Sequence, residues 1–270
     1  MEETRCPAPD GTELAVSVAG SGPPLLLIPG LGATRVVFDP LLPLLTPHVR
    51  AAVYDQRGIG ASQGDPGPFT TEQLGDDGVA VLDGLGITAA TVLGASFGGM
   101  VAQQLTVRHP GRVSALVLAA TGPGSAHVVR EPDVAASDAL LGKGARTPED
   151  AYRVACTVLY SRAFRDEHPD FIEGQVRDRA RRPVAPRAFR AQLAASRGHD
   201  AWDLLPLIDC PTLVMHGSDD AVMPLANAEL LAARIPGAIL EVFDGAGHLF
   251  FHEQPERTAQ AIASFVAARG

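Results

Sequence analysis

The stretch Gly94-Ala95-Ser96-Phe97-Gly98 has the pattern G-x-S-x-G and directly follows the apolar run Thr91-Val92-Leu93. A helix-length segment, residues 97–108, comes next. A serine between a strand and a helix, with glycines on both sides, is typical of a sharp turn that exposes the serine hydroxyl. The same pattern occurs in ordinary tight turns, so its meaning depends on what the rest of the chain supplies.

Apolar runs bounded by glycine or proline alternate with helix-length segments along the chain. We expect strands at residues 14–18, 24–28, 49–54, 90–93, 113–119, 212–215 and 239–243, and helices at residues 70–85, 97–108, 225–235 and 255–268. Several runs are almost continuously apolar, as in strands covered on both faces. The alternation predicts an α/β fold with a mostly parallel twisted sheet and helices on both faces.

The alternation stops from about residue 124 to residue 205, where charge rises and arginines cluster around residues 177–190. Two helical candidates in this stretch, residues 150–159 and 187–196, carry apolar residues at three- and four-residue spacings. Glycine and proline occur on both flanks, as expected at the joints of an insertion. We therefore expect an inserted helical cap at residues 124–206 and a core domain made of residues 1–123 and 207–270.

The chain has 270 residues with 22 basic and 31 acidic side chains, a formal charge of −9. This charge repels phosphate backbones and anionic lipid, so we expect neither nucleic acid nor a membrane as partner, but a small-molecule substrate. It also disfavours a strongly anionic substrate unless the arginines of the cap face the pocket. The sequence leaves the oligomeric state open.

The three cysteines, Cys6, Cys156 and Cys210, are odd in number and far apart. This arrangement offers neither a disulfide framework nor the spacing of a zinc site. The first residues lack the apolar stretch of a secretion signal, and nowhere do 18 apolar residues run together. We therefore expect a cytoplasmic protein.

Serine is a poor nucleophile on its own, so a base and an orienting acid must lie elsewhere in the chain. The segment His216-Gly217-Ser218-Asp219-Asp220-Ala221-Val222-Met223-Pro224 follows the apolar run 212–215 and places two acids at the end of a strand. After the last strand, Asp244-Gly245-Ala246-Gly247-His248 places a histidine on a glycine-rich loop. The order serine, aspartate, histidine is the order that a nucleophile elbow requires.

At this point the chain resembles the α/β-hydrolase superfamily in five motifs, which occur in the family's order over nearly the whole length. They are the oxyanion-type loop Ile28-Pro29-Gly30-Leu31-Gly32, the loop Asp55-Gln56-Arg57-Gly58-Ile59-Gly60-Ala61-Ser62, the elbow at residues 94–98, the acid loop Gly217-x-x-Asp220-x-x-x-Pro224, and the histidine loop Gly245-x-Gly247-His248. Two residues depart from the pattern: Pro29 stands where many members carry histidine, and Ile59 replaces a histidine frequent in the second motif. The resemblance implies the α/β-hydrolase fold with an inserted helical cap.

The resemblance also implies a catalytic triad of Ser96, Asp220 and His248. Ser96 would attack the substrate, His248 would accept and return its proton, and Asp220 would orient the imidazole. Asp219 is the rival acid, and the family spacing selects Asp220. The resemblance implies no cofactor and no metal.

Backbone amides and apolar side chains complete the predicted site. The N–H groups of Leu31 and Phe97 are expected to form the oxyanion hole. Val222 and Leu249, which neighbour the acid and the base, are candidates for the pocket wall. Trp202, at the end of the cap, is a further pocket candidate.

Other polar residues have simpler interpretations. Asp55 and Arg57 are interpreted as structural supports of the oxyanion loop. His252 lies four residues after His248, as zinc ligands on a helix do, but without a third ligand we do not predict a metal site. Four arginines surround Asp178: Arg177, Arg179, Arg181 and Arg182. We interpret them as a solvated helix face and not as an anion-binding patch.

The motifs predict a cofactor-free serine hydrolase that cleaves an ester or a lactone of a small to medium, largely apolar substrate. Haloalkane dehalogenases and epoxide hydrolases use an aspartate nucleophile, and residue 96 is serine. Cofactor-free haloperoxidases and perhydrolases usually have little or no cap, which the insertion of about 80 residues disfavours. A carbon–carbon hydrolase of the β-diketone or meta-cleavage-product type stays open, as does a lyase, cyclase or binding protein that uses the same pocket.

Overall fold

An eight-stranded sheet forms the centre of the part of the chain that the structure describes, residues 1–64, 67–128 and 134–268. In this computed structural model the strand order is β1-β2-β4-β3-β5-β6-β7-β8. The strands are β1 (Glu2–Pro7), β2 (Glu13–Ala19), β3 (Pro24–Ile28), β4 (Arg50–Tyr54), β5 (Ala90–Ala95), β6 (Val113–Ala119), β7 (Thr212–Gly217) and β8 (Ile239–Phe243). Strand β2 is antiparallel to β1 and β4, and the other neighbouring pairs are parallel. The predicted mostly parallel sheet is confirmed.

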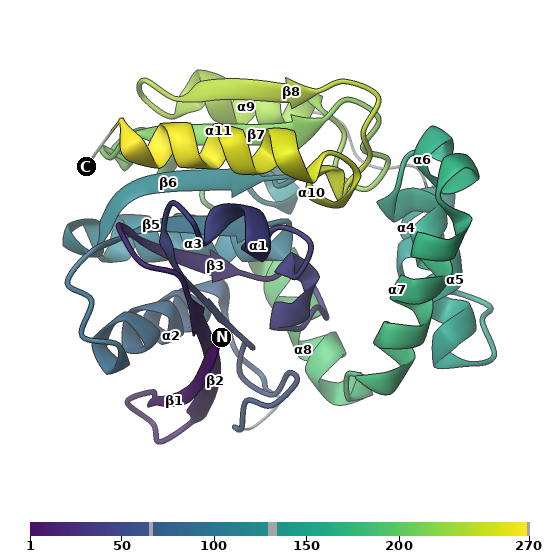
Figure 1. The fold of residues 1–270 in the computed structure, drawn as a ribbon, viewed down its shortest axis with the longest axis horizontal. Helices are drawn as coiled ribbons and strands as arrows, with labels where there is room; N and C mark the ends of the chain where they lie inside the picture. Colours follow the sequence, from purple (N-terminus) through teal and green to yellow (C-terminus); the bar gives the residue numbers. More distant parts are fainter. Residues whose placement is uncertain (65–66, 129–133, 269–270) are drawn as a thin grey trace.

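Helices cover both faces of the sheet (Figure 1). Helices α2 (Thr71–Gly84), α3 (Phe97–Arg108) and α9 (Ala226–Arg234) contribute to the core on one face, and helices α1 (Leu42–Leu45), α10 (Phe250–Glu253) and α11 (Pro255–Ala267) contribute to the core on the other. Short 3-10 helices lie at Arg35–Phe38, Pro110–Arg112, Ser125–His127 and Leu205–Leu207.

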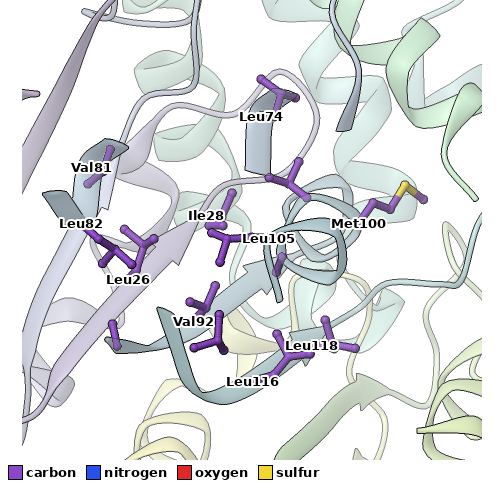
Figure 2. Close-up of a cluster of buried hydrophobic side chains, with 14 of the residues drawn as sticks. Leu26, Ile28, Leu74, Val81, Leu82, Val92, Met100, Leu105, Leu116 and Leu118 are labelled. Carbon is purple, nitrogen blue, oxygen red and sulfur yellow. The ribbon is translucent and has the colours of Figure 1, made fainter. Parts of the chain in front are cut away.

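Strand β3 shows why this sheet is buried on both sides. Its side chains alternate, so that Leu26 and Ile28 join one hydrophobic core while Leu25 and Leu27 join the other. Figure 2 shows Leu26 and Ile28 in the same cluster as Leu105 of helix α3. A run in which every residue is apolar is what a parallel strand needs when helices cover both faces.

Strand β1 is not predicted by the apolar pattern. Its residues Glu2, Glu3 and Arg5 are polar, and Cys6 is the buried residue of the strand. The strand lies at the edge of the sheet and pairs with β2 along its whole length. Backbone pairing, which leaves no hydrophobic pattern in the sequence, therefore defines this element.

Five α-helices lie between β6 and β7 in the described residues: α4 (Val134–Leu140), α5 (Pro148–Leu159), α6 (Arg162–Glu167), α7 (Pro169–Arg181) and α8 (Pro186–Gly198). We call α4–α8 the cap segment, which stands beyond the carboxyl ends of the parallel strands (Figure 1). Helices α5 and α8 coincide with the predicted helices at residues 150–159 and 187–196. The mostly polar α7 contains the arginines that were interpreted as a helix face, although its bounds were not predicted, and the domain boundaries at residues 124 and 206 stay a prediction.

The sheet changes direction between β3 and β5, which neighbour each other although β4 lies between them in the chain. At such a switch point the loops after two adjacent strands diverge and leave a crevice at the carboxyl edge. The loops after β3, β5, β7 and β8 all leave from this edge, so residues far apart in the sequence meet there. None of the described helices combines the length and apolar character of a membrane span.

Candidate functional site

Ser96 occupies a strained turn between β5 and α3. Its backbone has φ 54° and ψ −119°, a positive φ that non-glycine residues rarely adopt. Three hydrogen bonds hold this conformation: Ser96 N donates to the Ala119 carbonyl at 2.8 Å, and the Ser96 carbonyl accepts from Gly99 N and Thr121 Oγ1, each at 2.8 Å. Residues with a strained backbone that hydrogen bonds hold in place occur mostly at functional sites.

The elbow glycines are required by close backbone packing. A Cβ atom on Gly98 would collide with the carbonyl oxygen of Ile28, and one on Gly94 would collide with the carbonyl oxygen of Gly98. On the opposite side, a Cβ on Gly30 would lie only 3.3 Å from Ser96 Cβ. Absence of side chains at these positions therefore brings the loop after β3 directly against the serine.

Asp220, and not its neighbour Asp219, contacts the histidine. Asp220 Oδ1 accepts hydrogen bonds from the amides of Val222 and Met223, both at 2.8 Å, and Oδ2 accepts one from His248 Nδ1 at 2.8 Å. Asp219 is exposed, and its carboxylate accepts a hydrogen bond from Ser218 Oγ at 3.0 Å. The geometry thus selects the same acid as the motif spacing.

A second imidazole lies against the acid, which sequence reasoning missed. His216 Nε2 is 3.2 Å from Asp220 Oδ2 and donates to the carbonyl of Met223 at 2.6 Å. Burial by itself would raise the pKa of Asp220, but the charge of His248 and the hydrogen bonds from the two imidazoles hold it below its ordinary value. The carboxylate therefore stays ionised inside the protein. The four-residue separation of His216 and Asp220 was the available signal.

The histidine loop is held by backbone contacts to both the acid loop and the cap segment. Asp219 N donates to the Ala246 carbonyl at 2.9 Å, and a Cβ on Gly217 would collide with the carbonyls of residues 246 and 247. Leu249 N donates to the Leu159 carbonyl of α5 at 2.9 Å. These contacts fix the backbone on both sides of His248.

His252 and Glu253 have structural partners. His252 Nε2 donates to the Val37 carbonyl at 2.6 Å, so Nδ1 accepts the hydroxyl hydrogen of Tyr160 at 2.9 Å. Burial lowers the pKa of His252 to about 4, which keeps the ring neutral near pH 7. Glu253 accepts from the amides of Gly247 and Ser161 at 3.1 and 2.8 Å. No cluster of metal-ligating side chains occurs within the described ranges.

A cavity of about 270 Å³ lies between the sheet edge and the cap segment. Among its lining residues are six of the predicted site residues: Leu31, Ser96, Phe97, Val222, His248 and Leu249. Trp202 is not in this wall. Its ring stacks on His127 with centroids 4.8 Å apart, and the guanidinium of Arg234 lies 3.8 Å from its centroid. The expected pocket role of Trp202 therefore has no support in the geometry.

Two glutamines that sequence reasoning missed connect the cap segment to the loop after β3. Gln192 of α8 accepts from Gly32 N at 2.7 Å and donates to Gln56 Oε1 at 3.0 Å. Gln56 in turn donates to the Pro29 carbonyl at 2.7 Å. Both glutamine side chains belong to fully buried residues, and no periodic pattern in the sequence distinguishes them. This chain of hydrogen bonds fixes both ends of the segment 29–32.

Asp55 and Arg57 make structural contacts, but Gln56, and not Arg57, bonds to the oxyanion loop itself. Asp55 Oδ1 accepts from Arg35 N at 2.7 Å, which ties β4 to the chain after the loop 29–32. Arg57 donates from Nε to Asp77 Oδ2 at 2.6 Å and from Nη1 to Asp10 Oδ2 at 2.7 Å. Neither residue is part of the cavity lining.

Comparison with known proteins identifies the family. A family model described as alpha/beta hydrolase fold matches residues 23–255. The chain belongs to the α/β-hydrolase family. It is 33% identical over 243 residues to a poly(3-hydroxyalkanoate) depolymerase of Ectopseudomonas oleovorans, covering 90% of this chain and 84% of that protein.

Two further relatives agree with a hydrolase. The chain is 29% identical over 240 residues to 3-oxoadipate enol-lactonase 2 of Acinetobacter baylyi, covering 89% of this chain and 87% of that protein. The solved structure of an esterase from Exiguobacterium antarcticum matches with a TM-score of 0.87 at 27% identity, covering 98% of this chain and 100% of that one. With relatives named for hydrolytic activities, we assign this chain as a hydrolase.

Replacing Gln192 by leucine in this hydrolase should lower the free energy of unfolding by about 1–3 kcal/mol, because the buried Gly32 amide and Gln56 side chain lose their partner. Gln175→Leu is the matched control: Gln175 lines the same cavity, and its side chain makes no hydrogen bond to the described residues. Its stability should change by less than about 0.5 kcal/mol. Urea unfolding followed by circular dichroism measures both. Equal stabilities of Gln192→Leu and the parent would contradict the bridge.

Proposed function

We propose that this hydrolase cleaves an ester or a lactone with a mainly apolar body through a Ser96-His248-Asp220 triad. The observation that carries the proposal is the 2.8 Å hydrogen bond between His248 Nδ1 and Asp220 Oδ2, with His248 and the strained Ser96 lining one cavity. A serine hydroxyl needs a base that an acid holds in one tautomer, and these residue types supply that set.

The reaction follows from the hydrogen-bonding roles of the three side chains. Asp220 accepts the Nδ1 hydrogen of His248, so Nε2 is the free base that takes the proton of Ser96 as Oγ bonds to the substrate carbonyl carbon. The same proton passes to the leaving alkoxide oxygen when the ester bond breaks. Water then attacks the acyl-enzyme: it gives a proton to His248 as its oxygen bonds to the carbonyl carbon, the bond from that carbon to Ser96 Oγ breaks, and His248 returns the proton to Oγ as the acid leaves.

The amides of Leu31 and Phe97 are proposed to stabilise the oxyanion. Phe97 is the first residue of α3, where a helix leaves its amides without intrahelical partners. Leu31 lies between Gly30, which packs on Ser96, and Gly32, whose amide is held by Gln192. Because both amides are fixed before substrate binds, little reorganisation is needed when negative charge develops on the carbonyl oxygen.

The apolar wall and the relatives support an ester or a lactone as substrate. Leu140, Leu159, Val222 and Leu249 line the cavity, which favours an aliphatic acyl group. One relative is named as a depolymerase of poly(3-hydroxyalkanoate) and another as an enol-lactonase, and an esterase shares the fold. Carbonyl attack by an activated serine accounts for each of these bond types.

Ser96→Ala should lower kcat on p-nitrophenyl butyrate by about four to six orders of magnitude, because the nucleophile is lost while the fold is kept. Ser196→Ala is the matched control, since Ser196 lines the same cavity but lies on α8 and donates to Met100 Sδ. Its kcat should stay within about tenfold of the parent. Comparable rates for Ser96→Ala and the parent would rule out Ser96 as the nucleophile.

Asp220→Asn and Asp219→Asn separate the two candidate acids. In the first variant the introduced amide oxygen can still accept from the amides of residues 222 and 223, but it cannot stabilise a charged imidazole, so kcat should fall by about 10³–10⁴. The exposed Asp219 makes no contact with His248 in the structure, and its replacement should change kcat by less than about threefold. Steady-state kinetics on p-nitrophenyl butyrate measure kcat for both variants. A larger loss of kcat in Asp219→Asn than in Asp220→Asn would identify Asp219 as the acid of the triad.

A further inference from the structure

Arg179 of α7 places a positive charge in the wall of the cavity that contains Ser96. Both Arg179 and Arg182 line this cavity, although the helix was expected to present its arginines to solvent. The guanidinium lies against the loop after β3, because a Cβ atom on Gly32 would be 3.2 Å from Arg179 Nη2. The arginine and the serine therefore lie against the same loop and line the same cavity.

Among the described residues, Arg179 has no carboxylate within ion-pair distance, in contrast to Arg153 and Arg181. On the same and adjacent helices, Arg153 pairs with Glu173 at 2.9 Å and Arg181 pairs with Asp178 at 3.2 Å. The Arg179 guanidinium lies over the ring of Tyr152, whose centroid is 5.7 Å from Cζ. This guanidinium keeps its hydrogen-bond donors available toward the cavity.

A guanidinium in this position loses part of its hydration, and this loss destabilises the protein unless an anion compensates the charge. Arg179 is half-buried, and the desolvation of its charge lowers the pKa of the guanidinium from its ordinary value. Asp178 also lines the cavity, but its carboxylate already accepts from Arg181. Two arginines and one paired aspartate give this wall a positive charge in a protein whose net charge is −9.

We propose that Arg179 binds a carboxylate on the substrate, so that the hydrolase acts on an ester or lactone whose acyl part ends in a free carboxylate. The inference rests on the proposed serine hydrolase function and specifies its substrate class. A planar guanidinium matches a carboxylate with two parallel hydrogen bonds, which a neutral acyl chain cannot offer. The apolar side chains Leu140 and Val222 of the same cavity fit the methylene groups between the two ends.

The placement of the two groups favours a short spacer. Gly30 packs next to Ser96, with Oγ at 3.9 Å from a Cβ built on the glycine, and Gly32 packs next to Arg179. The Cα atoms of residues 30 and 32 are at most about 7 Å apart, since each peptide unit spans about 3.8 Å. Monoesters of aliphatic dicarboxylic acids, with adipate as the first choice, meet this requirement.

The kinetic test compares monomethyl adipate, which carries the free carboxylate, with neutral methyl hexanoate. Arg179→Met keeps an unbranched apolar stem and removes the guanidinium with its charge, so the ratio of kcat/KM for the two esters should fall by at least about tenfold. Arg177→Met is the matched control, because Arg177 lies two residues away on α7 and is exposed. Its ratio should equal that of the parent. An unchanged ratio in Arg179→Met would overturn the proposal.

A binding measurement separates this inference from the proposed reaction. Adipate is titrated calorimetrically into Ser96→Ala and into Ser96→Ala carrying Arg179→Met, where no turnover is required. We expect Kd to rise at least about tenfold in the double variant. Equal affinities, or no binding of adipate to Ser96→Ala, would contradict the carboxylate site. Hydrolysis that survives in Ser96→Ala would instead contradict the serine mechanism and leave the dependence of binding on Arg179 intact.

Discussion

The absence of a side chain at residue 98 is the constraint on which the site depends. The carbonyl of Ile28 lies where a Cβ of that residue would be, so the first turn of α3 packs directly on the end of β3. This contact places Ser96, at its positive φ, beside the loop 29–32. A side chain at residue 98 would push the strand end and the helix apart, and the hydroxyl would lose its position relative to the amides of that loop.

The sheet and the cap segment contribute different properties to the site. Loops from the carboxyl edge of the sheet hold Ser96, Asp220 and His248 through backbone contacts that depend on glycine and on strand order. The cap segment contributes side chains: Gln192 fixes the loop after β3, and Arg179 sets the charge of the cavity wall. The residues of the proposed triad thus belong to the core, while the cap segment supplies side chains to the cavity wall.

How far the sequence predicts this site depends on what fixes each residue. The elbow, the acid and the histidine could be predicted because motif spacing and the strand ends determine them, and the order of strands then gathers them at one edge. The inward direction of Arg179 and Arg182 could not, because α7 is polar on most sides and only its packing in the fold turns two arginines of the cluster toward the cavity. Trp202 failed as a pocket residue for the same reason, since stacking on His127 and Arg234 directs its ring elsewhere.

The central claim is that Ser96 bonds to the substrate carbonyl while the amides of Leu31 and Phe97 hold the oxygen. A crystal structure of the protein after reaction with a p-nitrophenyl phosphonate tests it most directly, because the adduct mimics the tetrahedral intermediate. We expect a bond from phosphorus to Ser96 Oγ and a phosphoryl oxygen about 3 Å from both amide nitrogens. An adduct on another residue, or a phosphoryl oxygen directed away from these amides, would contradict it.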